Sequence, residues 1–289
     1  MHVQRHRGDP GSMTQVVLCA DDYAISAGVS RGILELAQAG RISATSAMSA
    51  AEGWPQLARQ LDPVRERIGI GLHLTFTGLG PLGPMPRFAP QGRFPALRDV
   101  VRMAMSGRLP AAEIAAEIDR QLDAFTAVMG RAPDFVDGHQ HVHALPGIRR
   151  ALIAALRRRG LAGRTWLRDP ADSPAAIVRR GVSVPKALAV AGLSLGFGAE
   201  ARRAGFATNR GFAGFSRFDP RRHLALDFDR FFAAPGPAHL VMCHPGYVAA
   251  GDTLDDVVEA RERERAFLAS DEFPALLERR DFRLVKVPG

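Results

Sequence analysis

Short apolar runs alternate along the chain with segments whose apolar positions recur at helical spacing. In the first third, three runs of strand length end at polar or turn residues, as buried strands do. Ser26 follows the first run and is a suitable N-cap for a helix that reaches Ala39 and stops at Gly40. The three predicted strands are "QVVLCADD" (15–22), "RISATSAMS" (41–49) and "IGIGLHLTF" (68–76).

The same alternation continues through the rest of the chain. From Pro110, whose ring suits a first helical turn, an apolar stripe at helical spacing runs to Gly130. Two stretches fit no element: the Pro/Gly-rich segment 78–95, which has the length of a functional loop, and residues 172–220, which include the Gly/Phe-rich "GFATNRGFAGFS". Further predicted strands are "DFVDGHQHVH" (134–143), "RTWLRD" (164–169), "HLVMCHPG" (239–246) and "FRLVKV" (282–287), and further helices cover about 147–159 and 254–270.

Strands that alternate with helices indicate an α/β fold, in which crossover helices join the strands of a parallel sheet. The chain of 289 residues is long enough for one large domain or two small ones. Its length suits a (β/α) barrel better than a two-layer fold. In such a barrel the functional groups gather at the carboxyl ends of the strands.

Ionisable side chains stand at the predicted carboxyl ends of four strands. Asp21 and Asp22 end the first strand, His73 lies late in another, three histidines end a third, and His244 ends a late one. These strands would therefore present carboxylates and imidazoles to one face of the barrel. Each group also has a simpler interpretation: a helix cap or solvated carboxylates for the Asp pair, a hydrogen-bonded core residue for His73, and a turn contact for His244.

Three histidines on alternate positions, His139, His141 and His143, exceed what a core strand needs and favour a metal site. In a regular strand, residues two apart lie about 6.5 Å from each other, at roughly 3.3 Å per residue. Two nitrogens bound to one metal lie only about 3 to 3.5 Å apart. His139 and His143 therefore cannot both bind, at most two of the three can, and one is favoured. By similar geometry, Asp21 and Asp22 reach one site only if the backbone turns there.

Composition narrows the class of protein. The net charge of +8 and the pI near 10.7 would suit nucleic acid, but lysine occurs only at Lys186 and Lys286 and the arginines are spread along the chain. We therefore expect solvated arginines and no nucleic-acid partner. Cys19 and Cys243 lie in apolar stretches, which indicates buried thiols in a reducing compartment. Residues 1–12 lack the apolar core of a signal peptide, and no apolar run spans a bilayer, so we expect a cytoplasmic protein.

These motifs, in this order, resemble the YdjC-like family of carbohydrate deacetylases, also called the chitooligosaccharide and hopanoid-glycan deacetylase family. The resemblance implies a TIM-like variant (β/α) barrel with fewer than eight strands. It also implies one deacetylase domain, which we place over 13–289. Independently of the resemblance, we expect residues 1–12 to be a disordered extension or non-native residues, with Met13 as a possible true start. Where the family often has a histidine the chain has Gln140, which a regular strand would turn away from the ligand face. The motifs that carry the likeness are "ADDYAISAGVSRGILE", "GRISATSAM", "IGLHLTFT", "RQLDAFTAVMGRAPDFVDGHQHVHALP", "RDP" and "MCHPGY".

The resemblance also implies a set of site residues. Asp22, His73 and His139 would bind one divalent metal, Asp21 would be the catalytic base, and His244 would face the substrate. Nitrogen and oxygen ligands leave the metal open among Mg²⁺, Zn²⁺, Mn²⁺, Co²⁺ and Ni²⁺: two histidines favour a transition metal, whereas the family is commonly described with magnesium. Such a site would hydrolyse an N-acetyl group with metal-activated water, and His244 is a candidate acid for the leaving amine.

The expected partner is an N-acetylated sugar, and the sequence does not decide between a monomer and a homodimer. From the resemblance, Arg168 is expected to hold Asp21. The loop 78–95 and the segment containing Phe212 and Phe215 are expected to line the sugar cleft, because loops above a barrel rim commonly set specificity. Two other functions stay open: a metal hydrolase of O-acyl esters, and a non-catalytic sugar- or metal-binding barrel whose open metal position is filled by a side chain.

Overall fold

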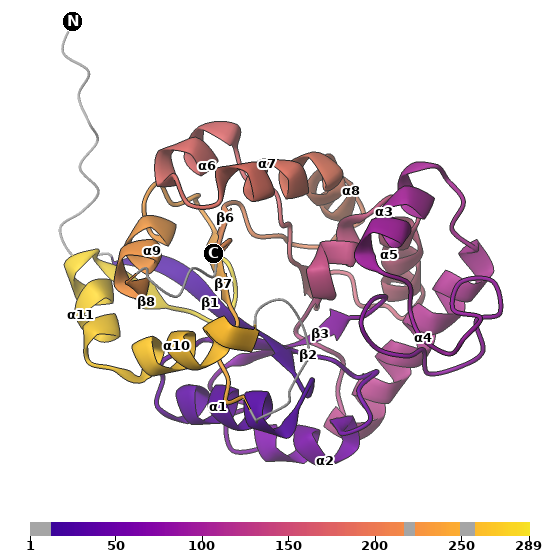
Figure 1. Cartoon of the computed structure of the whole chain (residues 1–289), viewed down its shortest axis with the longest axis horizontal. Coiled ribbons are helices and arrows are strands. Elements are labelled where there is room, and N and C mark those ends of the chain that lie inside the picture. The colour runs from indigo at the N-terminus through magenta and orange to yellow at the C-terminus, as the bar shows by residue number, and fades with distance from the viewer. Residues whose placement is uncertain (1–12, 217–222, 249–257) are drawn as a thin grey trace, which may run out of the picture.

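A parallel β-sheet forms the centre of the computed structural model, which describes residues 13–216, 223–248 and 258–289 (Figure 1). The strands are β1 (Thr14–Tyr23), β2 (Ala44–Ala47), β3 (Gly69–Leu74), β4 (Phe135–Gly138), β5 (Trp166–Leu167), β6 (Phe212–Ala213), β7 (His239–Cys243) and β8 (Phe282–Leu284). Within the described residues, seven of them follow the order β5-β4-β3-β2-β1-β7-β6, and β8 pairs with β1 outside this path. All ladders between these strands are parallel.

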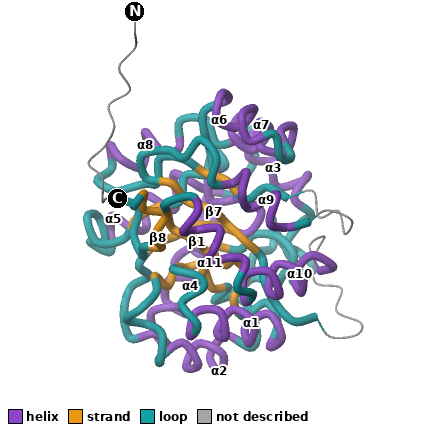
Figure 2. The backbone as a smooth tube through the Cα atoms, turned by 90° about the vertical axis from the view of Figure 1, so that its left-hand side faces the viewer, coloured by secondary structure: helices purple, strands orange, loops and turns teal. Residues whose placement is uncertain are grey.

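The two ends of this strand path meet through the segment that precedes β6. Leu167 in β5 forms a parallel bridge with Thr208, and its amide donates a hydrogen bond to the carbonyl of Ala207 at 2.9 Å. Figure 2 shows the strands in the middle of the molecule with helices around them. The structure therefore confirms an α/β barrel. Among the described residues its wall is the seven-strand path, which has fewer than eight strands as predicted.

The helices cover the outside of the barrel (Figure 1). Ser26 caps the first helix by accepting a hydrogen bond from the amide of Val29, and Gly130 ends the fourth in the left-handed conformation, both as predicted. The α-helices are α1 (Ala27–Gln38), α2 (Trp54–Ala58), α3 (Leu97–Met105), α4 (Ala111–Met129), α5 (Ile148–Arg158), α6 (Pro174–Arg180), α7 (Val184–Leu193), α8 (Phe197–Arg203), α9 (Leu224–Phe231), α10 (Val258–Ala269) and α11 (Glu272–Arg279). Residues 1–12 and 254–257, for which we expected a disordered extension and the start of a helix, lie outside the described residues.

Residues 172–220 were left without elements by the sequence, and their described part, 172–216, contains the helices α6, α7 and α8 and the strand β6. The helix α7, "VPKALAVAGL", is apolar around most of its circumference, so its apolar positions show no helical period. Only Ala187 of this helix is buried. Among the helices that the structure describes, none has the length and apolar character needed to cross a bilayer.

The predicted strand 134–143 is wrong beyond Gly138. The chain leaves β4 there and enters the 3₁₀ segment η2 (His139–Ala144). Gln140 and His141 have φ values of 52° and 62°, in the left-handed region that a strand excludes. The alternation of histidines therefore does not follow strand geometry, and the strand-spacing argument does not apply to them.

Alternate residues of β1 face two different cores. Val16 and Leu18 pack outward against the helices, whereas Val17 and Cys19 belong to the apolar cluster inside the barrel. Cys19 and Cys243 are buried free thiols, as expected. The inner face of the strand leads directly to Asp21, so its carboxylate enters the barrel where the apolar filling ends.

Candidate metal centre

The end of β1 makes a turn that directs two consecutive carboxylates into the barrel mouth. The pairing of β1 with β2 shifts register between Ala20 and Tyr23, and Asp22 has a φ of 69°. A left-handed conformation is uncommon for residues other than glycine, and such residues cluster at functional sites. We predicted that Asp21 and Asp22 could reach one site only if the backbone turns there, and the structure shows this turn.

Three ligand-type side chains converge beyond this turn. Asp22 Oδ1 lies 3.2 Å from His73 Nε2 and 3.1 Å from His139 Nδ1. These separations match the roughly 3 to 3.5 Å between two ligand atoms of one metal ion. All three side chains are buried, and together they offer one oxygen and two nitrogens. The residues therefore fit a single divalent metal ion.

A neighbouring carboxylate orients the imidazole of His73. Its Nδ1 lies 2.7 Å from Asp137 Oδ1 and 3.0 Å from Ser46 Oγ. With Nδ1–H donating to Asp137, the lone pair of Nε2 faces Asp22, as in the carboxylate–histidine–metal arrangement of many metal sites. The sequence did not assign this role to Asp137. The pairing of β3 with β4 places Asp137 beside His73, because the two residues are direct partners in this ladder.

A buried arginine holds the second carboxylate of β1. The Arg168 guanidinium donates to both oxygens of Asp21, at 2.7 and 2.6 Å, and also contacts Asp137. Burial raises the pKa of Asp21, but the charge of Arg168 more than offsets this and lowers the pKa to about 2. The expected contact between Arg168 and Asp21 is therefore present, and Asp21 is ionised. Cys19, Asp21 and Asp137 also have ligand spacing, but the cation among them is this guanidinium.

A second buried arginine, which sequence reasoning missed, contacts Asp22. Arg261 of α10 donates to Asp22 Oδ2 at 2.7 Å, so the two oxygens of this carboxylate face different partners. Burial raises the pKa of Asp22, but the charge of Arg261 and the neighbouring imidazoles of His139 and His73 lower it well below its usual range. Arg261 stands in the charged run "EARERER", where no sequence signal separates it from the solvated arginines.

The converging side chains line a cavity of about 230 Å³ at the carboxyl ends of the strands. Phe215 lines it, as expected, but Phe212 does not: its ring is buried behind His141 and Phe215. Within the described residues, the loop 78–95 contributes no wall, and α7 and Leu97 take that place. Gln140 also lines the cavity, contrary to the expectation for a regular strand. The lining residues are Asp21, Asp22, His73, Leu97, His139, Gln140, His141, Lys186, Val190, Phe215, Ser216, Met242 and His244.

His244 enters this cavity from the end of β7. Its backbone amide donates to Glu264 Oε2 at 2.6 Å, which fixes the first residue after the strand. Glu264 itself is buried, and burial raises the pKa of its carboxyl to about 7. The structure therefore brings Asp21, Asp22, His73, His139 and His244 to one cavity, as the strand-end argument predicted.

Comparison with known proteins identifies the family. A family model described as "YdjC-like protein" matches residues 15–279. The chain belongs to the YdjC-like family. It is 35% identical over 152 residues to a chitooligosaccharide deacetylase of Enterobacter sp. (strain 638), covering 52% of this chain and 58% of that protein. It is 32% identical over 185 residues to a carbohydrate deacetylase of Homo sapiens, covering 57% and 56%.

The chain thus spans a little over half the length of these YdjC-like relatives. A solved structure from Enterococcus faecalis V583, of a protein suggested to cleave cellobiose phosphate, covers 95% of this chain and 97% of its own. The two share 20% sequence identity and superpose with a TM-score of 0.70. This likeness shows a common fold along the whole barrel.

The remaining histidines of the 139–143 cluster have other contacts in this YdjC-like chain. His143 Nε2 donates to the carbonyl of Arg168 at 2.8 Å, and burial lowers the pKa of His143 to about 4. The ring of His141 meets the rings of Phe212 and Phe215 edge-on, at centroid distances of 5.7 and 5.4 Å. Within the described residues, only His139 of the cluster shares a ligand group with Asp22 and His73.

His141→Ala is expected to keep a full equivalent of metal, because His141 packs on aromatic rings outside the ligand group. Elemental analysis of the purified variant after metal loading measures this directly. The matched comparison is His139→Ala, two residues away, which should lose most of its metal. Equal loss in the two variants would show that His141 is a ligand.

The buried carboxyl of Glu264 should make stability fall as pH rises. Burial raises its pKa on folding from 4.5 to about 7. The hydrogen bond from the His244 amide and the charge of Arg261 oppose this rise, and Asp21 and Asp227 reinforce it. A raised acid pKa stabilises the folded state below the unfolded pKa, and this contribution is lost as pH rises through 7. Between pH 5 and pH 8, the free energy of unfolding of Glu264→Gln should therefore increase relative to that of the wild-type protein, by up to about 3 kcal/mol.

Urea unfolding of both proteins at several pH values measures this difference. Glu52→Gln is the control, because it removes an exposed carboxylate. A constant difference between Glu264→Gln and wild type across the pH range would contradict the prediction.

Proposed function

We propose that this protein is a metal-dependent hydrolase that removes N-acetyl groups from an amino sugar, an acetylated oligosaccharide or a glycolipid. The observation that carries the proposal is the group of Asp22, His73 and His139 with the ionised Asp21 beside it, in one cavity. Membership of the YdjC-like family, and relatives named chitooligosaccharide and carbohydrate deacetylases, support acetylated sugars as the substrate class.

Asp22, His73 and His139 would hold one divalent metal ion. Mg²⁺ and Zn²⁺ are the first candidates, and Mn²⁺, Co²⁺ and Ni²⁺ suit the same donor set. Three protein ligands leave coordination positions open, as a catalytic site requires. When bound, the ion would supply a Lewis acid that acidifies water and polarises the acetyl carbonyl.

Asp21 would accept the proton from the attacking water. Its carboxylate is fixed by the paired hydrogen bonds from Arg168, and each oxygen retains a lone pair for a further donor. A pKa of about 2 makes Asp21 a weak base. Its contribution would therefore come mainly from position, since it is held beside the water in the orientation that the transfer needs.

His244 would donate a proton to the departing amine, because an amine leaves poorly unless it is protonated. It enters the cavity from β7, while Asp21 enters from the neighbouring strand β1. The two residues would then have opposite proton-transfer roles on one substrate. Phe215 would offer an aromatic face to the sugar ring, with Phe212 supporting it from behind.

Acetate release tests the proposal. The protein would be loaded in turn with each of the five metals and incubated with N-acetylglucosamine, its β-1,4-linked oligomers and a matched panel of O-acetylated sugars. Acetate from the amides that disappears in Asp21→Asn would support an N-deacetylase. Release from the esters alone would favour an O-acyl ester hydrolase, and release from neither panel would favour a non-catalytic binding barrel.

A further inference from the structure

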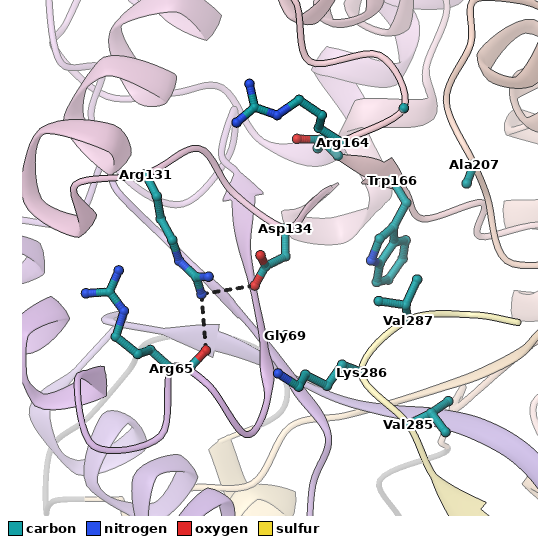
Figure 3. Close-up of a pocket in the computed structure, with 12 residues that line it drawn as sticks. Arg65, Gly69, Arg131, Asp134, Arg164, Trp166, Ala207, Val285, Lys286 and Val287 are labelled. Carbon is teal, nitrogen blue, oxygen red and sulfur yellow. Dashed lines mark hydrogen bonds and ion pairs between the residues drawn. The ribbon is translucent and has the colours of Figure 1, made fainter.

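A second cavity, of about 540 Å³, opens at the amino ends of the strands, away from the candidate metal centre. Its walls are the segments that lead into β3, β4 and β5, together with residues 285–287 after β8 (Figure 3). The first residues of two strands, Gly69 of β3 and Trp166 of β5, also line it. This volume lies within the range of small-molecule sites, about 300 to 1,000 Å³.

Among the described residues, four basic side chains and a single carboxylate line this cavity, which we call the basic cavity. The carboxylate, Asp134, is already engaged: its Oδ2 accepts from the amide of Ile70 at 2.8 Å and from Arg131 at 3.2 Å. Figure 3 shows Asp134, Trp166 and Lys286 around the middle of this space, with Arg131 beside Asp134 and the guanidinium groups of Arg164 and Arg65 at its edge. Arg65 forms ion pairs with Asp62 and Glu66, so the positive charge that no described carboxylate balances comes from Arg164 and Lys286. The basic residues are Arg65, Arg131, Arg164 and Lys286.

Two donors in the walls lack protein acceptors. Trp166 is 4% exposed, and its indole N–H makes no hydrogen bond within the described part of the chain. Figure 3 shows the indole nitrogen on the side of the ring that faces the basic cavity. Arg164 is exposed to solvent, and its guanidinium makes no hydrogen bond or ion pair with the described residues. A buried N–H without an acceptor costs free energy, which a ligand oxygen would recover.

The indole is also held rigidly. Trp166 stacks on Phe135 with ring centroids 4.3 Å apart and an interplanar angle of 17°. Phe135 lies in turn against the backbone of Gly71, where a Cβ atom would come within 2.4 Å of its ring. The indole therefore presents its N–H in one fixed direction, as a binding site requires.

We propose that the basic cavity binds a small phosphorylated ligand. Guanidinium groups match the geometry of phosphate oxygens, so Arg164 and Arg131 would donate to the phosphate, with Lys286 adding charge. The Trp166 N–H would donate to a further ligand oxygen, and Val285 and Val287 would contact the apolar parts of the ligand. This proposal does not depend on the deacetylase activity, because none of these residues lines the metal cavity.

Tryptophan fluorescence offers a direct test, because the chain has only two tryptophans. Trp54 stacks on Phe125 elsewhere in the core, so Trp54→Phe leaves Trp166 as the only indole. This variant would be titrated with inorganic phosphate and glucose 6-phosphate at constant ionic strength, with glucose and KCl as controls. We expect a saturable fluorescence change with the phosphates, at a dissociation constant of about 1 mM or below.

Arg164→Ala in the same background should weaken binding about tenfold or more, because a charge-assisted hydrogen bond to phosphate is lost. Arg157→Ala removes an exposed arginine of α5 and is the matched control. Calorimetric titration of the wild-type protein and of the single variant Arg164→Ala with the same phosphates repeats the comparison in proteins that keep Trp54. Absence of saturable binding in both assays, or equal affinity in Arg164→Ala and wild type, would overturn the proposal.

The same titration in Asp21→Asn separates the two cavities. We expect unchanged phosphate affinity, because Asp21 lines only the metal cavity. A changed phosphate affinity in this variant, with its fold verified by circular dichroism, would place the phosphate at the metal centre instead.

Discussion

His73→Ala is expected to remove bound metal and to reduce acetate release to the level of the metal-free protein. The imidazole would supply one of only three protein ligands, and its Nε2 already lies 3.2 Å from Asp22 Oδ1. Loss of a hydrogen-bond partner behind a ligand commonly costs about 10- to 100-fold in metal affinity, and loss of the ligand itself should cost more. Elemental analysis and acetate release measure the two effects on the same sample.

Asp137→Asn provides the graded comparison for this variant. It keeps an oxygen near His73 Nδ1 but removes the charge that fixes the imidazole, so metal affinity should fall within that 10- to 100-fold range. Circular dichroism would verify that both variants fold, since Asp137 also contacts Arg168. Wild-type metal content in His73→Ala would exclude His73 from the site.

Asp21→Asn is expected to retain metal while kcat falls by about 10² to 10⁴, the usual contribution of a positioned acid or base. The amide keeps the shape of the side chain but no longer accepts the proton. The substitution also removes the negative charge that pairs with the buried Arg168. Breaking such a buried pair lowers the free energy of unfolding by about 3–5 kcal/mol. Thermal melting therefore has to accompany the kinetics, which are measured well below the melting temperature.

His244→Ala distinguishes the two proton-transfer roles. This variant should also retain metal. Its rate of hydrolysis should be low on the amide but close to the wild-type rate on an aryl acetate, because a phenolate leaves without a proton. Asp21→Asn should stay slow on both the amide and the aryl ester, because both need the attacking water. Equal losses on the two substrates for His244→Ala would contradict the general-acid role and leave His244 as a positioning residue.

The strand-end argument located most of the site because it relies on a property of the barrel rather than on local detail. Apolar runs that end in Asp21, His73 or His244 must place those side chains at one mouth, whatever the loops do. Local geometry was less accessible. The sequence "HQHVH" has the alternation of a strand, yet Gln140 and His141 adopt left-handed conformations. These conformations could not be predicted, because neither residue is a glycine.

Two supporting residues could not be found from the sequence for different reasons. Asp137 depends on register, because only the pairing of β3 with β4 places it beside His73. Arg261 depends on how α10 packs, since its neighbours in the charged run have the same composition and only packing turns one arginine inward.

The helix α7 was not predicted, because its apolar residues cover most of its circumference and leave no helical period to detect.

The join between β5 and the segment before β6 has a consequence for how the site responds to distant changes. Leu167 makes the bridge to Thr208, and the next residue, Arg168, reaches across the interior to Asp21. One step further, Asp169 and Asn209 exchange hydrogen bonds across the same join. A substitution that loosens this join, such as Asn209→Ala, would shift the guanidinium and thereby reorient the carboxylate of Asp21. Catalysis would then slow while the three proposed metal ligands, which belong to β1, β3 and η2, keep their positions.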